Sequence, residues 1–168
     1  YGEADGSCSC GESLRRRYWG RLSGPLLDRL DLQVVMRRPP ARELARGLMS
    51  GDARSADSGA LEQPETSAVV AQRVRRARAR MAARNPGGHC NAQIAAEALP
   101  AVLALEEPAR QLWERAMEQR RLSARGGMRL LRVARTIADL AGQPTVGATA
   151  IAEALTFRSF DLVGADPF

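Results

Sequence analysis

The stretch Ser123-Ala-Arg-Gly-Gly-Met-Arg-Leu-Leu-Arg-Val-Ala-Arg-Thr-Ile-Ala-Asp-Leu140 has the apolar period of an amphipathic helix. Apolar residues recur every three or four positions along one face, which comprises Leu130, Ala134, Ile137 and Ala141. On the same helical spacing, the opposite side is formed by Arg132, Arg135 and Asp139, which we expect to point away from the apolar face. The pattern predicts a helix over residues 124–141.

Helical patterns continue on both sides of this stretch. A helix is predicted over 65–84, where one face holds Val70, Val74, Ala77 and Met81, and one flank holds Arg73, Arg76, Arg80 and Arg84. The arginines form either a solvated face or a surface that follows a phosphate backbone. Further helices are predicted at 92–99, 108–121 and 147–158. Short connections between amphipathic helices predict a compact bundle.

The first third of the chain has a different pattern. Residues 14–22 form a short basic helix, and Leu32-Gln-Val-Val-Met36 is a candidate strand because it is mostly apolar and β-branched. A lone strand is not stable, so we expect this one to join a sheet supplied by other parts of a longer protein. A weak helix is predicted at 41–49, and the polar, aperiodic stretch 50–64 is predicted to be a mobile connector.

The composition narrows the class of protein. The 168 residues are 45% apolar and only 4% aromatic, which favours a helix-on-helix core of small aliphatic side chains. The net charge of +6 comes from 25 basic residues, all of them arginine, and is compatible with a polyanionic partner. No apolar run is long enough for a membrane span. Three cysteines, an odd number, argue against a disulfide framework and favour the cytoplasm.

A second motif, Arg21-Leu-Ser-Gly-Pro-Leu-Leu-Asp-Arg-Leu-Asp-Leu32, presents Arg29 on a turn before the candidate strand. Together with Ser123–Leu140, it resembles the C-terminal half of the magnesium-chelatase-like AAA+ ATPases, in the branch of the ComM/YifB family. The resemblance implies a mainly α fold, in which a helical lid bundle follows a short remnant of the αβ core. It implies a partial core edge at 1–40, a connector at 41–64 and the lid domain at 65–168.

The resemblance implies that Arg29 is an arginine finger. Such a guanidinium comes from a neighbouring subunit and stabilises the charge that develops on the γ-phosphoryl group of ATP. It must be held on a rigid turn, and the Gly24-Pro25 turn meets that requirement. The alternative is that Asp28, Arg29 and Asp31 form a surface ion cluster of little energetic value.

The resemblance also implies that Arg125 is the sensor-2 arginine, which contacts the γ-phosphate of ATP in its own subunit. Arg129 and Arg132 are near neighbours and remain alternatives for this contact. The helix N-terminus favours phosphate as well. This chain has Gly-Gly-Met-Arg where relatives often have Gly-Tyr-Asp-Arg, and the alternative interpretation is a set of solvated helix arginines.

No metal site is predicted within the chain. The available ligands are Cys8, Cys10, His89 and Cys90, and the two pairs lie far apart in the sequence. Relatives carry a Cys-Pro-Cys-Gly motif immediately upstream of the point at which this chain begins. His89 is predicted to be a solvated loop residue, and Asn91, where relatives also have asparagine, is predicted to be structural.

The resemblance implies the C-terminal section of a ring-forming AAA+ ATPase, a homo-oligomer and specifically a hexamer, that uses ATP and Mg²⁺ to remodel DNA during branch migration in natural transformation. No G-x-x-x-x-G-K-[ST] phosphate loop occurs in the chain, so we expect the Mg²⁺ ligands to lie outside it and the chain alone to be inactive. Two alternatives stay open: the motor subunit of a magnesium chelatase, and a stand-alone helical nucleic-acid-binding protein.

Overall fold

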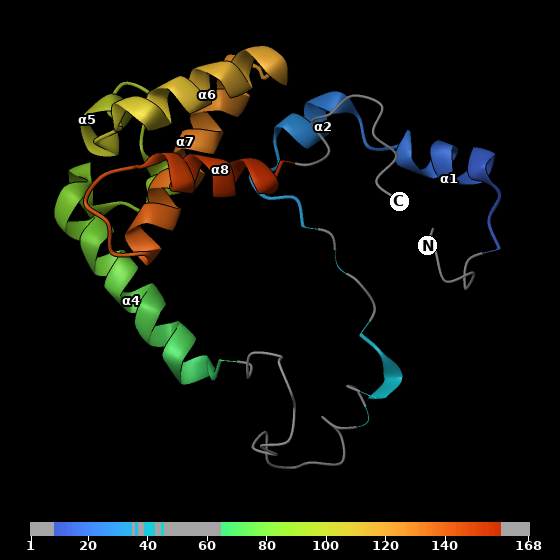
Figure 1. Ribbon diagram of the computed structural model, residues 1–168, viewed down its shortest axis with the longest axis horizontal. Helices are drawn as coiled ribbons and strands as arrows, with labels where there is room; N and C mark the ends of the chain where they lie inside the picture. Colours follow the sequence, from blue (N-terminus) through green and yellow to red (C-terminus); the bar gives the residue numbers. More distant parts are fainter. Residues whose placement is uncertain (1–8, 35, 37–38, 43–44, 46–64, 159–168) are drawn as a thin grey trace.

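The computed structural model describes residues 9–34, 36, 39–42, 45 and 65–158, and helices dominate that part of the chain (Figure 1). Two short helices come first, α1 (Glu12–Trp19) and α2 (Gly24–Asp28). The bundle consists of α4 (Ser67–Arg84), the 3-10 turns η1 (Pro86–Gly88) and η2 (Asn91–Gln93), α5 (Leu99–Leu103), α6 (Glu107–Gln119), α7 (Ala124–Leu140) and α8 (Ala148–Thr156). The expected mainly helical fold class is confirmed.

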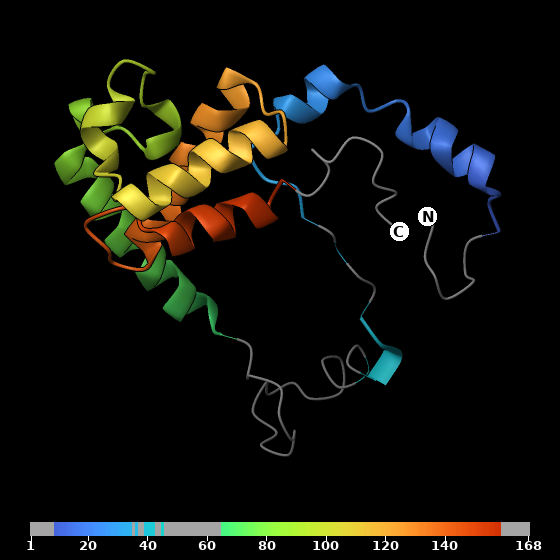
Figure 2. The same ribbon diagram turned by 45° about the horizontal axis from the view of Figure 1, so that its top comes forward.

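Helix α7 is the centre of the bundle. It packs against α4, α5, α8 and η2, and α6 lies against α8 (Figures 1 and 2). The core around it is aliphatic, as the low aromatic content predicts, and its most deeply buried members include Leu130, Ala134, Val146, Ile151 and Ala154. The segment between α5 and α6 meets the segment between α7 and α8 in an isolated parallel bridge, formed by Leu105 and Val146. Every element that contacts α7 is therefore positioned by it.

The predicted strand at 32–36 is wrong for the residues that the structure describes there. Leu32, Gln33, Val34 and Met36 have no regular secondary structure, and Val35 lies outside the described residues. The Gln33 backbone N–H donates to the Phe157 backbone carbonyl at 2.8 Å, and this bond attaches the segment to the end of α8. The physical reason is that a strand needs a partner strand, and none is available among the described residues.

The predicted helix at 92–99 is also wrong. This segment begins with the 3-10 turn η2, and α5 starts only at Leu99, with Pro100 in its first turn. Proline is well suited to that position because its missing N–H would be unpaired there in any case. Pro100 therefore lies at the start of a helix. Its position directly after the predicted helix at 92–99 had indicated the end of one.

Arg135 and Asp139 are fully buried, with 0% of each residue exposed, which their predicted position away from the apolar face did not indicate. An apolar stripe shows only which side of a helix packs against apolar neighbours. In α7 the polar side is covered too, because α4 and η2 pack on it. Ala141, assigned to the apolar face, is exposed.

The Asp139 carboxylate is the centre of a buried hydrogen-bond network. Arg84, at the end of α4, approaches it with Nη1 2.6 Å from Oδ1 and Nη2 2.9 Å from Oδ2. Arg135 Nη2 reaches Oδ1 at 3.0 Å, and Asn91 Nδ2 donates to Oδ2 at 2.8 Å. Burial alone would raise the pKa of Asp139, but the hydrogen bonds from Arg84 and Asn91 and the two arginine charges outweigh it and hold this pKa below its ordinary value.

Arg135 extends this network to the connection between α7 and α8. Its Nη1 donates to the Pro144 carbonyl at 2.8 Å, and its Nη2 donates to the Gln143 carbonyl at 2.7 Å. Asn91, which is 1% exposed, also donates to the Thr136 hydroxyl at 3.1 Å and accepts from Arg84. Asn91 therefore holds η2 against both α4 and α7, consistent with the structural role predicted for it.

The connector predicted at 50–64 lies outside the described residues, as do most of the weak helix predicted at 41–49 and the residues after Arg158. Within the described part of the chain, no helix is both long enough and apolar enough to cross a membrane.

We predict that Asp139→Asn destabilises the fold by about 3–5 kcal/mol, because it leaves the buried Arg135 without its counter-charge. The pKa of Asp139 is lower in the folded state than in the unfolded state, where it is about 3.9. The contribution of Asp139 to the free energy of unfolding is therefore complete above the unfolded pKa, and it is lost as the pH falls through the folded pKa. Urea unfolding followed by circular dichroism should therefore show a large loss at pH 7 that shrinks in acid. The matched control is Glu107→Gln, which removes an exposed ion pair and should leave the urea midpoint nearly unchanged. Equal midpoints for the two variants would contradict the prediction.

Candidate functional site

Arg29 lies at the C-terminal end of α2, directly after a compact turn. The Ser23 hydroxyl accepts a hydrogen bond from the Leu26 backbone amide at 3.3 Å, and Pro25 occupies the first turn, so the sequence defines where this short helix begins. The Arg29 side chain is exposed, and its Nη1 donates to the Pro25 carbonyl at 2.9 Å. The guanidinium is thus held beside its own helix at the protein surface.

The surface ion cluster considered for this turn does not form. Among the described residues, no carboxylate pairs with Arg29, and the two neighbouring aspartates are paired elsewhere. Asp28 accepts a hydrogen bond from the Ser123 hydroxyl at 2.9 Å and lies 3.8 Å from Nη2 of the buried Arg158. Asp31 pairs with Arg129, with Nη1 2.6 Å from Oδ1. Both aspartates therefore attach the Arg29 turn to the bundle and leave the Arg29 charge uncompensated.

The two sequence motifs meet in space through these contacts. Ser123 is the N-cap of α7, and its hydroxyl accepts from the Gly126 amide at 2.9 Å while it donates to Asp28. Arg129, six residues further along α7, also donates to the main-chain carbonyl of Arg29. The beginning of α7 and the end of α2 are therefore joined on both sides of Arg29.

The two glycines after Arg125 lie within the first turn of α7, where the packing is close. A Cβ at Gly126 would lie 3.1 Å from Asp28 Oδ1, and a Cβ at Gly127 would overlap the sulfur of Met117. The Trp113 indole donates to the Gly127 carbonyl at 3.2 Å. The contact with Asp28 was not foreseen from the sequence, although the glycine pair inside a predicted helix was a signal of close approach.

The three arginines considered for the sensor-2 contact differ in their partners. Arg129 is paired with Asp31, and its side chain is 20% exposed. Arg132 donates to the Ile94 carbonyl from Nη2 at 2.8 Å and from Nε at 3.2 Å. Arg125 is exposed, and no partner holds its guanidinium among the residues that the structure describes. Arg129 and Arg132 are engaged in holding the fold together, and Arg125 is free to bind an anion.

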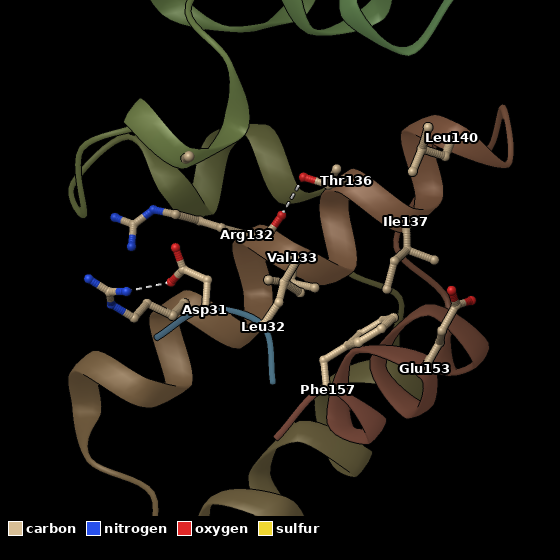
Figure 3. A pocket seen from close by; sticks show the side chains of 11 residues that line it. Asp31, Leu32, Arg132, Val133, Thr136, Ile137, Leu140, Glu153 and Phe157 are labelled. Atoms are coloured by element: carbon tan, nitrogen blue, oxygen red, sulfur yellow. Dashed lines mark hydrogen bonds and ion pairs between the residues drawn. The ribbon is translucent and has the colours of Figure 1, made fainter. Parts of the chain in front are cut away.

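A cavity of about 390 Å³ lies beside these contacts, along α7 and α8 (Figure 3). Its apolar part is formed by Val133, Ile137 and Phe157, and Asp31 and Arg132 lie at its polar end (Figure 3). The remaining lining residues are Leu32, Ala92, Arg129, Thr136, Leu140 and Glu153. Arg29 and Arg125 do not line this cavity, so the structure does not bring all four predicted site residues together.

Three of the four candidate metal ligands lie among the described residues. Cys8 lies outside the described residues, Cys10 is half-buried, and His89 is exposed. The Cys90 thiol donates to Gln93 Oε1 at 3.2 Å. Within the part of the chain that the structure covers, no three His, Cys, Asp or Glu side chains are grouped to hold a metal ion.

Two protein-family models match the chain. Residues 64–158, more than half of it, match the model described as magnesium chelatase, subunit ChlI C-terminal, and residues 1–44 match the model described as magnesium chelatase, subunit ChlI. The first match covers the whole described bundle from α4 to α8. The second covers the Arg29 turn.

Curated relatives match over most of the chain. An uncharacterized protein of Mycobacterium tuberculosis is 39% identical over 90% of this chain and 27% of its own length. The YifB protein of Escherichia coli is 34% identical over 86% of this chain and 26% of its own. The competence protein ComM of Haemophilus influenzae is 34% identical over 85% of this chain and 25% of its own length. The chain thus spans about a quarter of the length of these relatives, and it belongs to the magnesium chelatase ChlI family, in which its bundle corresponds to the C-terminal domain.

Proposed function

We propose that this chain is the C-terminal section of a ComM/YifB-like AAA+ ATPase, and that it supplies two arginines to ATP hydrolysis in a homo-oligomeric ring. Arg29 acts on the nucleotide of the neighbouring subunit, and Arg125 acts on the nucleotide of its own. The observation that carries the proposal is that both guanidiniums lack a carboxylate partner in the described structure, although the turn and the helix that carry them are joined by paired aspartates.

The surroundings of Arg29 suit a finger that acts across a subunit boundary. A guanidinium that stabilises the charge on a transferring phosphoryl group must be unpaired in the free subunit and well positioned. Asp28 and Asp31 provide the positioning because each is bonded to the bundle, and neither neutralises Arg29. The exposed position at the end of α2 allows a neighbour to approach.

Arg125 suits a contact with phosphate in the same subunit. It lies in the first turn of α7, a helix of 17 residues whose N-terminal N–H groups favour an anion. The same turn carries Ser123, which is bonded to the Arg29 turn through Asp28. A movement of α7 that follows the state of the bound nucleotide would therefore also move the support of Arg29, which couples one subunit's pocket to the next.

Beyond the ATPase chemistry, we propose that the ring is a hexamer in the cytoplasm and remodels DNA during natural transformation, a role compatible with a relative that is named a competence protein. Mg²⁺ would neutralise the phosphates of bound ATP, and its ligands are expected outside this chain because the phosphate loop is absent from the sequence. The division into a core edge at 1–40, a connector at 41–64 and a lid at 65–168 is part of the same proposal.

The motor subunit of a magnesium chelatase is the second candidate. The observation in its favour is the description of the two matching family models, both of which name subunit ChlI of that enzyme. The two functions differ in their partner, because a chelatase motor acts on a protein and a DNA-remodelling motor must bind DNA. Stimulation of ATP hydrolysis in the longer protein by DNA would decide between them. A stand-alone nucleic-acid-binding protein would show no such hydrolysis.

We predict that the 168-residue chain alone does not hydrolyse ATP. The sequence has no phosphate loop and contains no lysine, so the group that usually holds the β- and γ-phosphates is absent from it. Phosphate release by the purified chain should equal that of a buffer control. Turnover that disappears in the Arg29→Ala or Arg125→Ala variant would contradict this prediction.

We predict that Arg29→Ala and Arg125→Ala fail differently in the longer protein that carries the phosphate loop. Loss of Arg29 should spare ATP binding and ring assembly but lower turnover by roughly two or more orders of magnitude. Loss of Arg125 should also weaken ATP affinity, because its target is in its own subunit. Turnover measured alongside binding of a fluorescent ATP analogue separates the two effects. Arg115→Ala, on the exposed side of α6, is the control for a surface charge lost elsewhere.

Mixed rings test the assignment of each arginine to its subunit. When an Arg29→Ala subunit is mixed with a phosphate-loop mutant that keeps its arginine, the first subunit has an intact pocket and receives Arg29 from its neighbour, so activity should return. An Arg125→Ala subunit mixed in the same way has no intact pocket and should stay inactive. Identical behaviour of the two variants in mixed rings would mean that Arg29 does not act across the subunit boundary.

A further inference from the structure

Helix α4 carries six positive charges and no negative ones, and among the described residues only Arg73 and Arg84 pair with carboxylates outside it, Glu65 and Asp139. Its 18 residues include no aspartate or glutamate and six arginines, at positions 73, 75, 76, 78, 80 and 84. Its buried residues, Ala77 and Met81, lie in the second half, and the first half extends away from the other helices (Figure 1). Like charges three or four positions apart repel each other on a helix. The arrangement therefore weakens the isolated helix and is suited to an anionic partner.

Three of these arginines line one cavity of about 330 Å³ between α4 and the end of α7. They are Arg73, Arg76 and Arg80, and no acidic side chain is among the residues that line it. Arg80 is held by the Asp139 carbonyl at 3.1 Å and lies over Gly142, where a Cβ would be 3.1 Å from Arg80 Nη2. The positive φ of 76° at Gly142 also favours glycine there. The Arg80 guanidinium is thus fixed at one end of the cavity.

The other two arginines are available to a ligand. Arg76 has no carboxylate partner among the described residues. Arg73 is paired with Glu65, but the two side chains are 45% and 48% exposed, so this ion pair contributes little and is open to exchange. An incoming phosphate would replace Glu65 as the partner of Arg73 with a similar forked contact.

We propose that this arginine-lined face of α4 binds the backbone phosphates of DNA. Arg73 and Arg80 are separated by about 10 Å along the helix axis, which is close to three phosphate-to-phosphate spacings of one DNA strand along the duplex axis. Since no aromatic or amide-bearing side chain other than Gln72 lines the cavity, the surface offers positioning without stacking on bases. The inference rests on the proposed DNA-remodelling function and assigns a surface to it.

The test is binding of a fluorescein-labelled DNA duplex, and of its single strand, to the 168-residue chain without ATP. Anisotropy would be measured between about 50 and 200 mM salt, the range over which phosphate contacts weaken binding most visibly. The variant Arg73→Gln/Arg76→Gln should bind roughly tenfold or more weakly at the lower salt and show a salt slope smaller by about 2.

The matched control is Arg110→Gln/Arg115→Gln on α6. Arg110 is paired with exposed glutamates, as Arg73 is with Glu65, and Arg115 has no carboxylate partner among the described residues. This pair loses the same charge and should keep the affinity and salt slope of the unchanged chain. Circular dichroism should show equal helix content for both variants.

Three results would overturn the proposal. They are an unchanged chain that does not bind DNA at low salt, an equal loss in both double variants, and binding of poly-glutamate that depends on the same two arginines as strongly as binding of DNA. Because no ATP is present, each of these results leaves the assignments of Arg29 and Arg125 untouched. A failure of the mixed-ring test, in turn, leaves the DNA surface standing.

Discussion

The buried carboxylate of Asp139 is the charge around which the helical bundle is assembled. It accepts hydrogen bonds from Arg84 of α4, Arg135 of α7 and Asn91 of η2, and its ionisation supplies the counter-charge to the two arginines. A carboxylate with no exposed surface costs several kcal/mol to desolvate, and only well-formed partners offset that cost. The network therefore contributes more to the choice of one arrangement of α4, η2 and α7 than to the net stability of the fold.

The same helix transmits this arrangement to the candidate site. The 17 residues of α7 extend over about 25 Å, with the buried network at the C-terminal end and the contacts to α2 at the N-terminal end. Ser123 and Arg129 at that end hold Asp28 and Asp31, and through them the turn that presents Arg29. A rigid central helix is thus the physical link between the core and the two free guanidiniums.

Local patterns in the sequence predicted the bundle well because caps, prolines and apolar periods act within a few residues. Ser123 begins α7 as a cap, and α6 and α8 begin and end within two residues of their predicted limits. The strand at 32–36 failed because strand formation depends on a partner that local sequence does not specify. The burial of Arg135 and Asp139 was missed because a helical period does not reveal whether the polar side faces water or a polar interior.

For the site, the sequence predicted which residues to examine but not which of them were free. Arg29 next to two aspartates, and Arg125 next to two further arginines, are ambiguous as patterns, since a partner within reach in sequence need not be the partner in space. Tertiary contacts show which of these groups are paired: the aspartates pair with Ser123, Arg158 and Arg129, and Arg132 is held by the Ile94 carbonyl. Long-range pairing of this kind is invisible to spacing rules that act over one or two helical turns.

The hydrogen-bond partners of each arginine also explain how this one residue type can either stabilise the core or remain available to a ligand, in a chain that contains no lysine. An arginine that has found carbonyl and carboxylate partners, as Arg135 has, is part of the core and stabilises one conformation. One left without a carboxylate partner on a supported turn, as Arg29 is, keeps its full charge for a ligand, although its Nη1 donates to the Pro25 carbonyl. The guanidinium suits both situations because its planar fork binds either carbonyls or phosphate without a change of protonation. The net charge of +6 is therefore less informative about function than the partners of individual guanidiniums, such as Arg29 at the α2–α7 junction and Arg76 on α4, neither of which pairs with a carboxylate in the described structure.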